Sequence, residues 1–126
     1  MKILPDEQLP VKLKYRFAPS LTVSTERDMK WLGMKDHELF LKIKDEKFDL
    51  LITNDQNLKY QINRKQLYFS LLDLNYPSNR YEDLIFIVPA LNNVLIILSQ
   101  SITISKNGKG IVFTFTNQHL QEFMHL

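Results

Sequence analysis

The sequence predicts an α/β protein with a mainly parallel sheet, and three observations lead to this class. Short apolar runs at residues 2–4 and 50–52 have the length of strands that are covered on both faces. Amphipathic helical patterns at residues 9–17 and 36–47 precede and separate such runs. Strands that alternate with helices favour βαβ crossovers, which place the strands parallel in one sheet.

Length and composition indicate one domain in a reducing compartment. The chain has 126 residues, 44% of them hydrophobic, which is enough for one core. The net charge of +2 permits a nucleic acid partner without requiring one. The absence of cysteine excludes disulfides and thiolate metal sites and favours the cytoplasm. We expect no signal peptide and no membrane segment, because the most apolar stretch, residues 84–98, is too short and is interrupted by polar residues.

The first unit of the pattern is a strand followed by a helix. Residues 2–4 predict the strand, and Asp6 can cap the helix that follows. That helix is expected to bury Leu9, Leu13 and Phe17, which are four residues apart.

The pattern then repeats through the middle of the chain. Residues 21–24 predict a second strand and residues 25–29 a short helical turn. A helix is expected from Asp36 to about Lys47, and the strand at residues 50–52 follows it directly.

The second half continues with a strand and two helical segments. Residues 68–72 are apolar enough for a fourth strand. Residues 80–99 are expected to form two helical pieces, because Pro89 must kink or restart the helix.

The C-terminal region predicts a β-hairpin. Alternating apolar residues at 102–104 and 111–115 flank an Asn-Gly pair, and residues 117–126 are expected to form a short helix. We therefore expect a core domain over residues 1–101. A hairpin and short tail at residues 102–126 are expected to pack on the same domain, as an accessory to the core rather than part of the site.

Acidic residues at the ends of the predicted strands are the main functional signal. Asp6, Asp55 and Asp73 each follow a strand, so a parallel sheet would gather them at one edge, where α/β proteins bind ligands. Asp36 and Glu38 open a helix that could lean over the same edge. Converging carboxylates repel one another, and Mg²⁺ or Mn²⁺ would relieve that repulsion and support phosphodiester hydrolysis.

Each of these acids also has a structural interpretation. Asp36 is a good helix N-cap, Glu38 suits the first turn, and Asp6 can cap its own helix. Asp73 is expected to be a plain turn residue. Asp55 is harder to explain structurally, because it lies among five consecutive hydrogen-bonding side chains.

Polar and basic side chains near the acids are candidates for substrate binding. Thr53 and Asn57 belong to the same strand-end segment as Asp55, and Lys59 and Arg80 could hold phosphates beside it. The chain has neither a Gly-rich phosphate loop nor a Ser-His-Asp arrangement, which argues against those two kinds of site.

The N-terminal motif Asp6-Glu7-Gln8-Leu9-Pro10 resembles the Asp-Glu-Asn-Leu-Pro opening of a group of small bacterial PIN-like domain proteins. The similarity reaches to about residue 101 and includes residues 24–31, 33–39, 48–60, 77–80 and 88–91. The resemblance implies a three-layer α/β/α PIN-like fold and a Mg²⁺- or Mn²⁺-dependent ribonuclease. Such proteins are often toxins, so it also implies RNA as substrate and an antitoxin protein as partner.

The resemblance assigns roles to particular residues. Asp6 matches the first acid, Asp55 the acid of a Thr-x-Asp motif, and Glu38 the middle acid, with Asp36 as the alternative. Two positions depart from the pattern: Asn57 stands where relatives often carry Asp, and Pro5 replaces an aliphatic residue.

Two other functions stay open. One is a non-catalytic PIN-like interaction module, in which the hairpin could pair with a partner or with a second copy in a homodimer. The other is a phospho-acceptor receiver domain, which also carries acids after its first and third strands. The receiver's Lys-Pro pair after a fifth strand is missing from this sequence.

Overall fold

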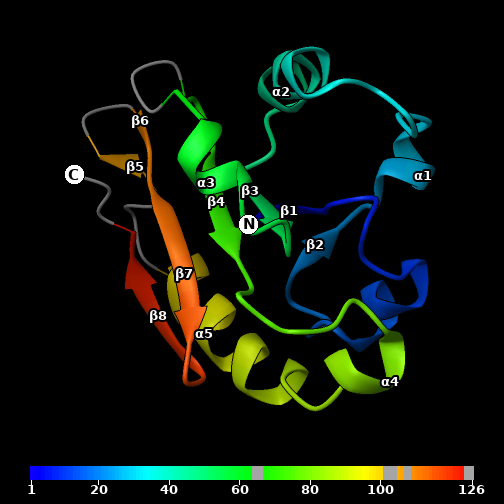
Figure 1. Cartoon of the computed structure of the whole chain (residues 1–126), viewed down its shortest axis with the longest axis vertical. Helices are drawn as coiled ribbons and strands as arrows, with labels where there is room; N and C mark the ends of the chain where they lie inside the picture. The colour runs from blue at the N-terminus through cyan, green and yellow to red at the C-terminus, as the bar shows by residue number, and fades with distance from the viewer. Residues whose placement is uncertain (64–66, 101–104, 107–108, 124–126) are drawn as a thin grey trace.

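The computed structural model describes residues 1–63, 67–100, 105–106 and 109–123. The strands are β1 (Lys2–Pro5), β2 (Thr22–Val23), β3 (Leu50–Thr53), β4 (Ser70–Asp73), β5 (Ser105–Lys106), β6 (Lys109–Gly110), β7 (Val112–Thr116) and β8 (His119–Glu122). The helices are the 3-10 helix η1 (Val11–Arg16) and the α-helices α1 (Glu26–Met29), α2 (Asp36–Asp45), α3 (Leu58–Gln61), α4 (Tyr81–Leu84) and α5 (Val88–Gln100). Figure 1 shows their arrangement.

A six-stranded sheet forms the centre of the molecule, in the order β2-β1-β3-β4-β7-β8. The first four pairings across this sheet are parallel, and β8 is antiparallel to β7. The strands β5 and β6 form a separate antiparallel pair. The predicted α/β class with a mainly parallel sheet is therefore confirmed.

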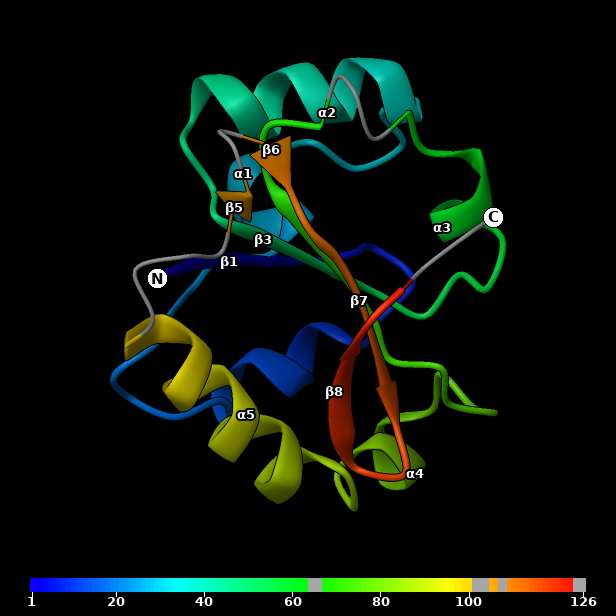
Figure 2. The same cartoon turned by 90° about the vertical axis from the view of Figure 1, so that its left-hand side faces the viewer.

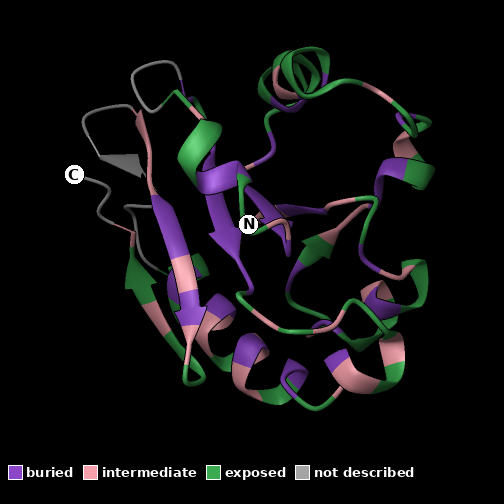
Figure 3. Ribbon diagram, in the orientation of Figure 1, coloured by how far each residue is buried: buried purple, intermediate pink, exposed green. Residues whose placement is uncertain are grey.

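Helices lie on both sides of this sheet, with α2 and α5 on opposite sides (Figure 2). Side chains of β3 alternate between the two sides, as a strand requires. Leu50 and Ile52 join a cluster that includes residues of α5, whereas Leu51 joins a second cluster that includes residues of α2. Figure 3 shows β3 and β4 buried along their length and the outer strand β8 largely exposed.

The segment after β1 differs from the predicted helix. It is a 3-10 helix whose N-cap is Pro10, with no side-chain cap hydrogen bond, so the predicted capping role of Asp6 is wrong. The predicted burial of Leu9, Leu13 and Phe17 is confirmed. Pro10 occupies the N-cap position of this helix. The carboxylate of Asp6 therefore does not cap the helix and can bind a different group.

The middle and second half follow the predicted pattern more closely. The structure confirms a strand near residues 21–24, a helical turn near 25–29 and the helix that begins at Asp36. The two helical pieces near residues 80–99 are α4 and α5, and Pro89 lies in the first turn of α5, where proline is tolerated.

The last two strands, β7 and β8, belong to the central sheet. The predicted strand at residues 111–115 appears as β7, which pairs in parallel with β4 and contributes buried residues to both core clusters, so it is not an accessory. The predicted strand at residues 102–104 lies outside the described residues. The predicted C-terminal helix is wrong for residues 119–122, which form β8 after a turn in which Asn117 and Gln118 have positive φ.

Over the described ranges, no helix is both long enough and apolar enough to cross a membrane.

Candidate functional site

Two acidic residues follow the neighbouring strands β1 and β3. Asp6 comes directly after β1, and Asp55 comes two residues after β3. The chain passes from β1 to β2 on one side and later returns to β3 on the other side, so the strand order reverses between β1 and β3. The carboxyl ends of the strands at such a reversal are where open α/β sheets bind ligands.

The hydroxyl of Thr53 connects these two acidic residues. Thr53 Oγ1 donates a hydrogen bond to Asp6 Oδ2 at 2.9 Å and accepts one from the backbone N–H of Asp55 at 3.0 Å. Thr53 is fully buried at the end of β3. Its hydroxyl is thus engaged with the two acids, and it orients them rather than presenting itself to a substrate.

Glu26 is a further acid at this edge, which the sequence analysis missed. Its side chain is 1% exposed and accepts a hydrogen bond from the backbone N–H of Glu7. Burial, followed by hydrogen bonding and repulsion from Asp6, raises the pKa of Glu26 to about 8. Near neutral pH Glu26 is therefore mainly protonated beside Asp6.

A capping box positions Glu26. Thr25 Oγ1 accepts a hydrogen bond from the backbone N–H of Asp28, and Asp28 accepts one from the backbone N–H of Thr25. This Thr-x-x-Asp pattern is readable in the sequence and locates the start of α1. The pattern does not reveal that Glu26 is buried. An acidic residue in the first turn of a helix is usually exposed to solvent, where it interacts favourably with the helix dipole.

Asp36, and not Glu38, shares the electrostatic environment of the strand-end acids. Burial and repulsion from Asp6, Asp55 and Glu7 raise the pKa of Asp36. The Glu38 side chain is 57% exposed, and the imidazole of His37 lies 3.9 Å from its carboxylate. Of these two acids, Asp36 is therefore the one whose pKa responds to the strand-end carboxylates.

Asp73 is not the plain turn residue that the sequence predicted. It is fully buried at the end of β4, and its carboxylate lies 2.6 Å from Lys59 Nζ. It also accepts a hydrogen bond from the backbone N–H of Asn75 at 2.9 Å. Lys59 is only 8% exposed, and its ammonium group is already paired with the buried carboxylate of Asp73.

The other two predicted substrate-binding residues lie on the surface. Asn57 is exposed and its backbone N–H donates to Asp55 Oδ1 at 3.0 Å, which helps to fix that carboxylate. Arg80 is exposed and forms an ion pair with Glu82.

Asn54 is a buried polar residue that the sequence analysis did not single out. Its amide nitrogen donates to the carbonyl oxygen of Tyr76 at 2.9 Å and to Asn79 Oδ1 at 2.8 Å, and its amide oxygen accepts from the Tyr76 N–H at 2.9 Å. These bonds hold the loop after β4 against the end of β3.

The donor set suits a hard divalent cation only in part. Asp6, Asp36 and Asp55 offer oxygen atoms, which Mg²⁺ and Mn²⁺ prefer. Among the described residues, however, no group of three or more His, Cys, Asp or Glu side chains is arranged so that it could hold a metal ion. Mg²⁺ often binds through one or two carboxylates and keeps several waters, and such a site needs fewer protein ligands.

In comparisons with protein-family models, curated proteins and solved structures, nothing matches this chain.

Proposed function

We propose that the chain is a PIN-like, three-layer α/β/α protein that hydrolyses RNA with the help of Mg²⁺ or Mn²⁺. The observation that carries this proposal is the gathering of Asp6, Glu26, Asp36 and Asp55 near the reversal of strand order. The charged groups that shift the pKa of Asp36 are all carboxylates. Such a cluster is electrostatically costly unless a cation or a shared proton relieves it.

Each acid of this group has its own role in the proposed site. Asp6 and Asp55 would hold the cation, since the Thr53 hydroxyl fixes the carboxylate of Asp6 and the Asn57 N–H fixes that of Asp55. A bound divalent ion supplies an activated water and stabilises the charge that develops on the phosphate. Asp36 adds negative charge at the same edge, and the protonated Glu26 limits the repulsion felt by Asp6.

The wider role follows from the resemblance in the N-terminal motif. We propose a cytoplasmic toxin ribonuclease that is held inactive by an antitoxin protein. The neighbouring gene tests this role, because an adjacent short reading frame that encodes a DNA-binding protein would support it.

The test is RNA cleavage in the presence of Mn²⁺ or Mg²⁺, together with melting curves. We expect the ion to raise the melting temperature through mass action, and Asp6→Asn and Asp55→Asn to abolish both that increase and cleavage. Without metal, the same variants should be neutral or more stable by ~1 kcal/mol, because one repelling charge is gone. Asp45→Asn, at an exposed position at the end of α2, is the matched control and should leave cleavage intact.

The two candidates for the middle acid give a second test of the same site. Asp36→Asn should reduce cleavage by two or more orders of magnitude, whereas Glu38→Gln should change it less than threefold. The reason is that Asp36 shares the field of Asp6 and Asp55, and Glu38 faces solvent. The opposite ranking would contradict the assignment.

The strand order favours a receiver domain as the second candidate. The five parallel strands follow the order second, first, third, fourth and fifth, which is also that of doubly wound receiver sheets. In a receiver, Asp55 would accept a phosphoryl group. Labelling of the protein by acetyl phosphate, lost in Asp55→Asn, would support this function over hydrolysis.

A further inference from the structure

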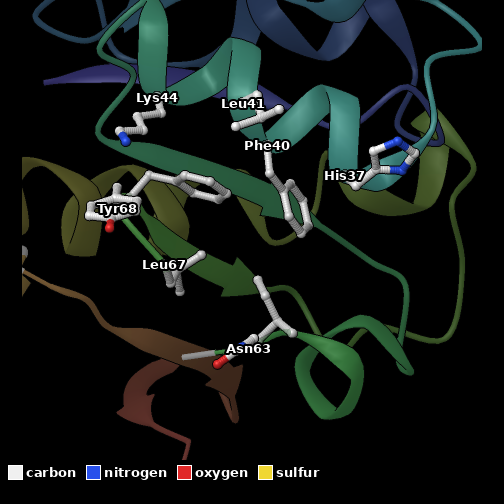
Figure 4. A pocket seen from close by; sticks show the side chains of 9 residues that line it. His37, Phe40, Leu41, Lys44, Asn63, Leu67 and Tyr68 are labelled. Atoms are coloured by element: carbon white, nitrogen blue, oxygen red, sulfur yellow. The ribbon is translucent and has the colours of Figure 1, made fainter. Parts of the chain in front are cut away.

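A cavity of about 400 Å³ lies between α2 and the residues that precede β4. Figure 4 shows Phe40 and Lys44 extending from α2 toward the segment that holds Leu67 and Tyr68. His37 and Leu41 of α2 also line the cavity. The other lining residues in the described part of the chain are Ile62, Asn63 and Phe69. The cavity therefore combines apolar walls with a few polar and basic groups.

Aromatic rings form much of the wall. Phe40 and Phe69 pack edge to face, with ring centroids 5.3 Å apart. Tyr68 is 51% exposed, so its side chain borders both the cavity and the solvent. A large exposed aromatic beside a cavity offers a surface on which a planar ring can stack.

Two lysines flank Tyr68. Lys44 Nζ lies 4.2 Å from the centroid of the Tyr68 ring, and Lys109 Nζ lies 4.7 Å from it. Lys109 is brought there from β6, because the Gly110 N–H donates to the Leu67 carbonyl oxygen at 2.8 Å. A side chain at Gly110 would overlap the carbonyl of Phe69, so this close approach requires glycine.

Among the described residues that line the cavity there is no carboxylate, so the charge of this part of the cavity is opposite to that of the acidic edge. An aromatic wall beside paired cations is complementary to a planar ring that carries an anionic group. We propose that this cavity binds a nucleotide, with the base against Tyr68 and Phe40 and the phosphate toward Lys44 and Lys109.

The position of the cavity connects it to the acidic site. Asp36 belongs to the acidic edge, and the next residue of α2, His37, lines the cavity. In this respect the inference rests on the proposed function: an RNA whose scissile phosphate lies at the acids would place a neighbouring nucleotide in the cavity. The cavity itself is defined by its own residues, and its binding can be measured without cleavage.

The test is calorimetric titration of the full chain in EDTA with 5′-AMP, 5′-UMP, adenosine and inorganic phosphate. We expect both mononucleotides to bind more tightly than adenosine or phosphate alone, and their affinity to fall as salt rises. Tyr68→Ala should weaken binding about tenfold through lost stacking, and Tyr68→Phe should restore it. Lys44→Gln should also weaken binding and reduce its salt dependence.

Tyr15→Ala is the matched control. Tyr15 is also an exposed tyrosine beside a lysine, with Lys14 Nζ 5.2 Å from its ring centroid, but it does not line the cavity. Its substitution should leave nucleotide binding unchanged. Equal weakening by Tyr15→Ala and Tyr68→Ala would overturn the proposal.

A second arm separates a free nucleotide from a residue of RNA. A short single-stranded RNA that binds at least tenfold more tightly than 5′-UMP, with Tyr68→Ala reducing both affinities, assigns the cavity to RNA. Equal affinities assign it to free nucleotides. Absence of both mononucleotide and RNA binding in EDTA would overturn the proposal. A complex in which a partner protein inserts an apolar side chain into the cavity would overturn it as well.

Failure of this inference and failure of the proposed function give different results. If the protein binds nucleotides, Asp6→Asn leaves that binding intact, and no metal supports cleavage, the hydrolase function is excluded and nucleotide binding in the cavity stands. The opposite result is RNA cleavage whose rate and apparent affinity are unchanged by Tyr68→Ala and Lys44→Gln, in a protein that binds no nucleotide. It would exclude nucleotide binding in the cavity and leave the hydrolase function standing.

Discussion

At the scale of single residues, Glu26 has the most perturbed environment at the acidic edge. Its pKa of about 8 lies well above its ordinary value of 4.5. The folded protein therefore keeps a proton that the unfolded chain releases as pH rises above 4.5. The stability that Glu26 contributes is fully present below pH 4.5 and is lost progressively as the pH rises to about 8.

The first prediction is that Glu26→Gln removes this loss. Glutamine imitates the protonated acid, because it can donate to Asp6 and accept from the Glu7 N–H. The wild type should lose roughly 2–4 kcal/mol more than the variant between pH 5 and pH 8. Chemical denaturation across that range measures the difference, and Glu38→Gln is the control. Parallel profiles for the wild type and Glu26→Gln would contradict the raised pKa.

The second prediction concerns Thr53. Thr53→Val keeps the shape of the side chain but leaves the Asp55 N–H without its hydroxyl acceptor and Asp6 without its donor. We expect a loss of about 1–3 kcal/mol in the free energy of unfolding. Thr53→Ser retains the hydroxyl and should recover most of that loss. Equal stability of the valine and serine variants in urea denaturation would argue against this hydrogen-bonded link.

At the scale of elements, the buried ion pair between Lys59 and Asp73 joins α3 to the end of β4. The lysine also lies over the rings of Tyr60 and Phe123, at 5.3 and 5.5 Å from their centroids. The pair thus connects α3 with β4 and with the residue that follows β8. An unpaired charge at either position would be buried without compensation.

The third prediction follows from this burial. Lys59→Met should destabilise the protein by about 3–5 kcal/mol, because it leaves the carboxylate of Asp73 unpaired. The double variant Lys59→Met/Asp73→Leu should recover part of that loss. Arg80→Met, which breaks the exposed pair with Glu82, should change the melting temperature little. A large effect of Arg80→Met with a small effect of Lys59→Met would reverse the ranking.

At the scale of the whole molecule, β7 completes the sheet between β4 and β8. Its residues Val112, Phe113 and Phe115 are buried, with exposures of 2%, 9% and 4%. Each large apolar side chain of this kind stabilises the fold by about 1.5–3 kcal/mol. Together they approach the full stability of a typical domain, about 5–15 kcal/mol.

The fourth prediction is that truncation after Gln100 abolishes folding, with loss of the native circular dichroism spectrum. The expectation from sequence was that the C-terminal strands are accessory, and the position of β7 in the sheet reverses it. Truncation after Thr116, which removes the largely exposed β8 and keeps β7, should cost less. A cooperative melting transition in the protein truncated after Gln100 would contradict this prediction.

The sequence by itself determined the α/β class, most of the elements and the two acids at the ends of β1 and β3. These features depend on local patterns, such as the apolar run of residues 50–52 and the helical spacing of Leu9, Leu13 and Phe17. The strand β3 is buried along its length, and Leu9, Leu13 and Phe17 are buried as well, although only Leu13 lies within a helix and that helix is 3-10.

Only the tertiary structure decided which polar side chains meet. Thr53 contacts Asp6 across 47 residues of sequence, and Glu26 accepts the N–H of Glu7 across 19. The same holds for the burial of Glu26 and for the place of β7 in the sheet. The physical reason is that periodicity reports which face of an element is covered, whereas the partner and the pKa of a buried carboxylate depend on groups that other elements bring to it.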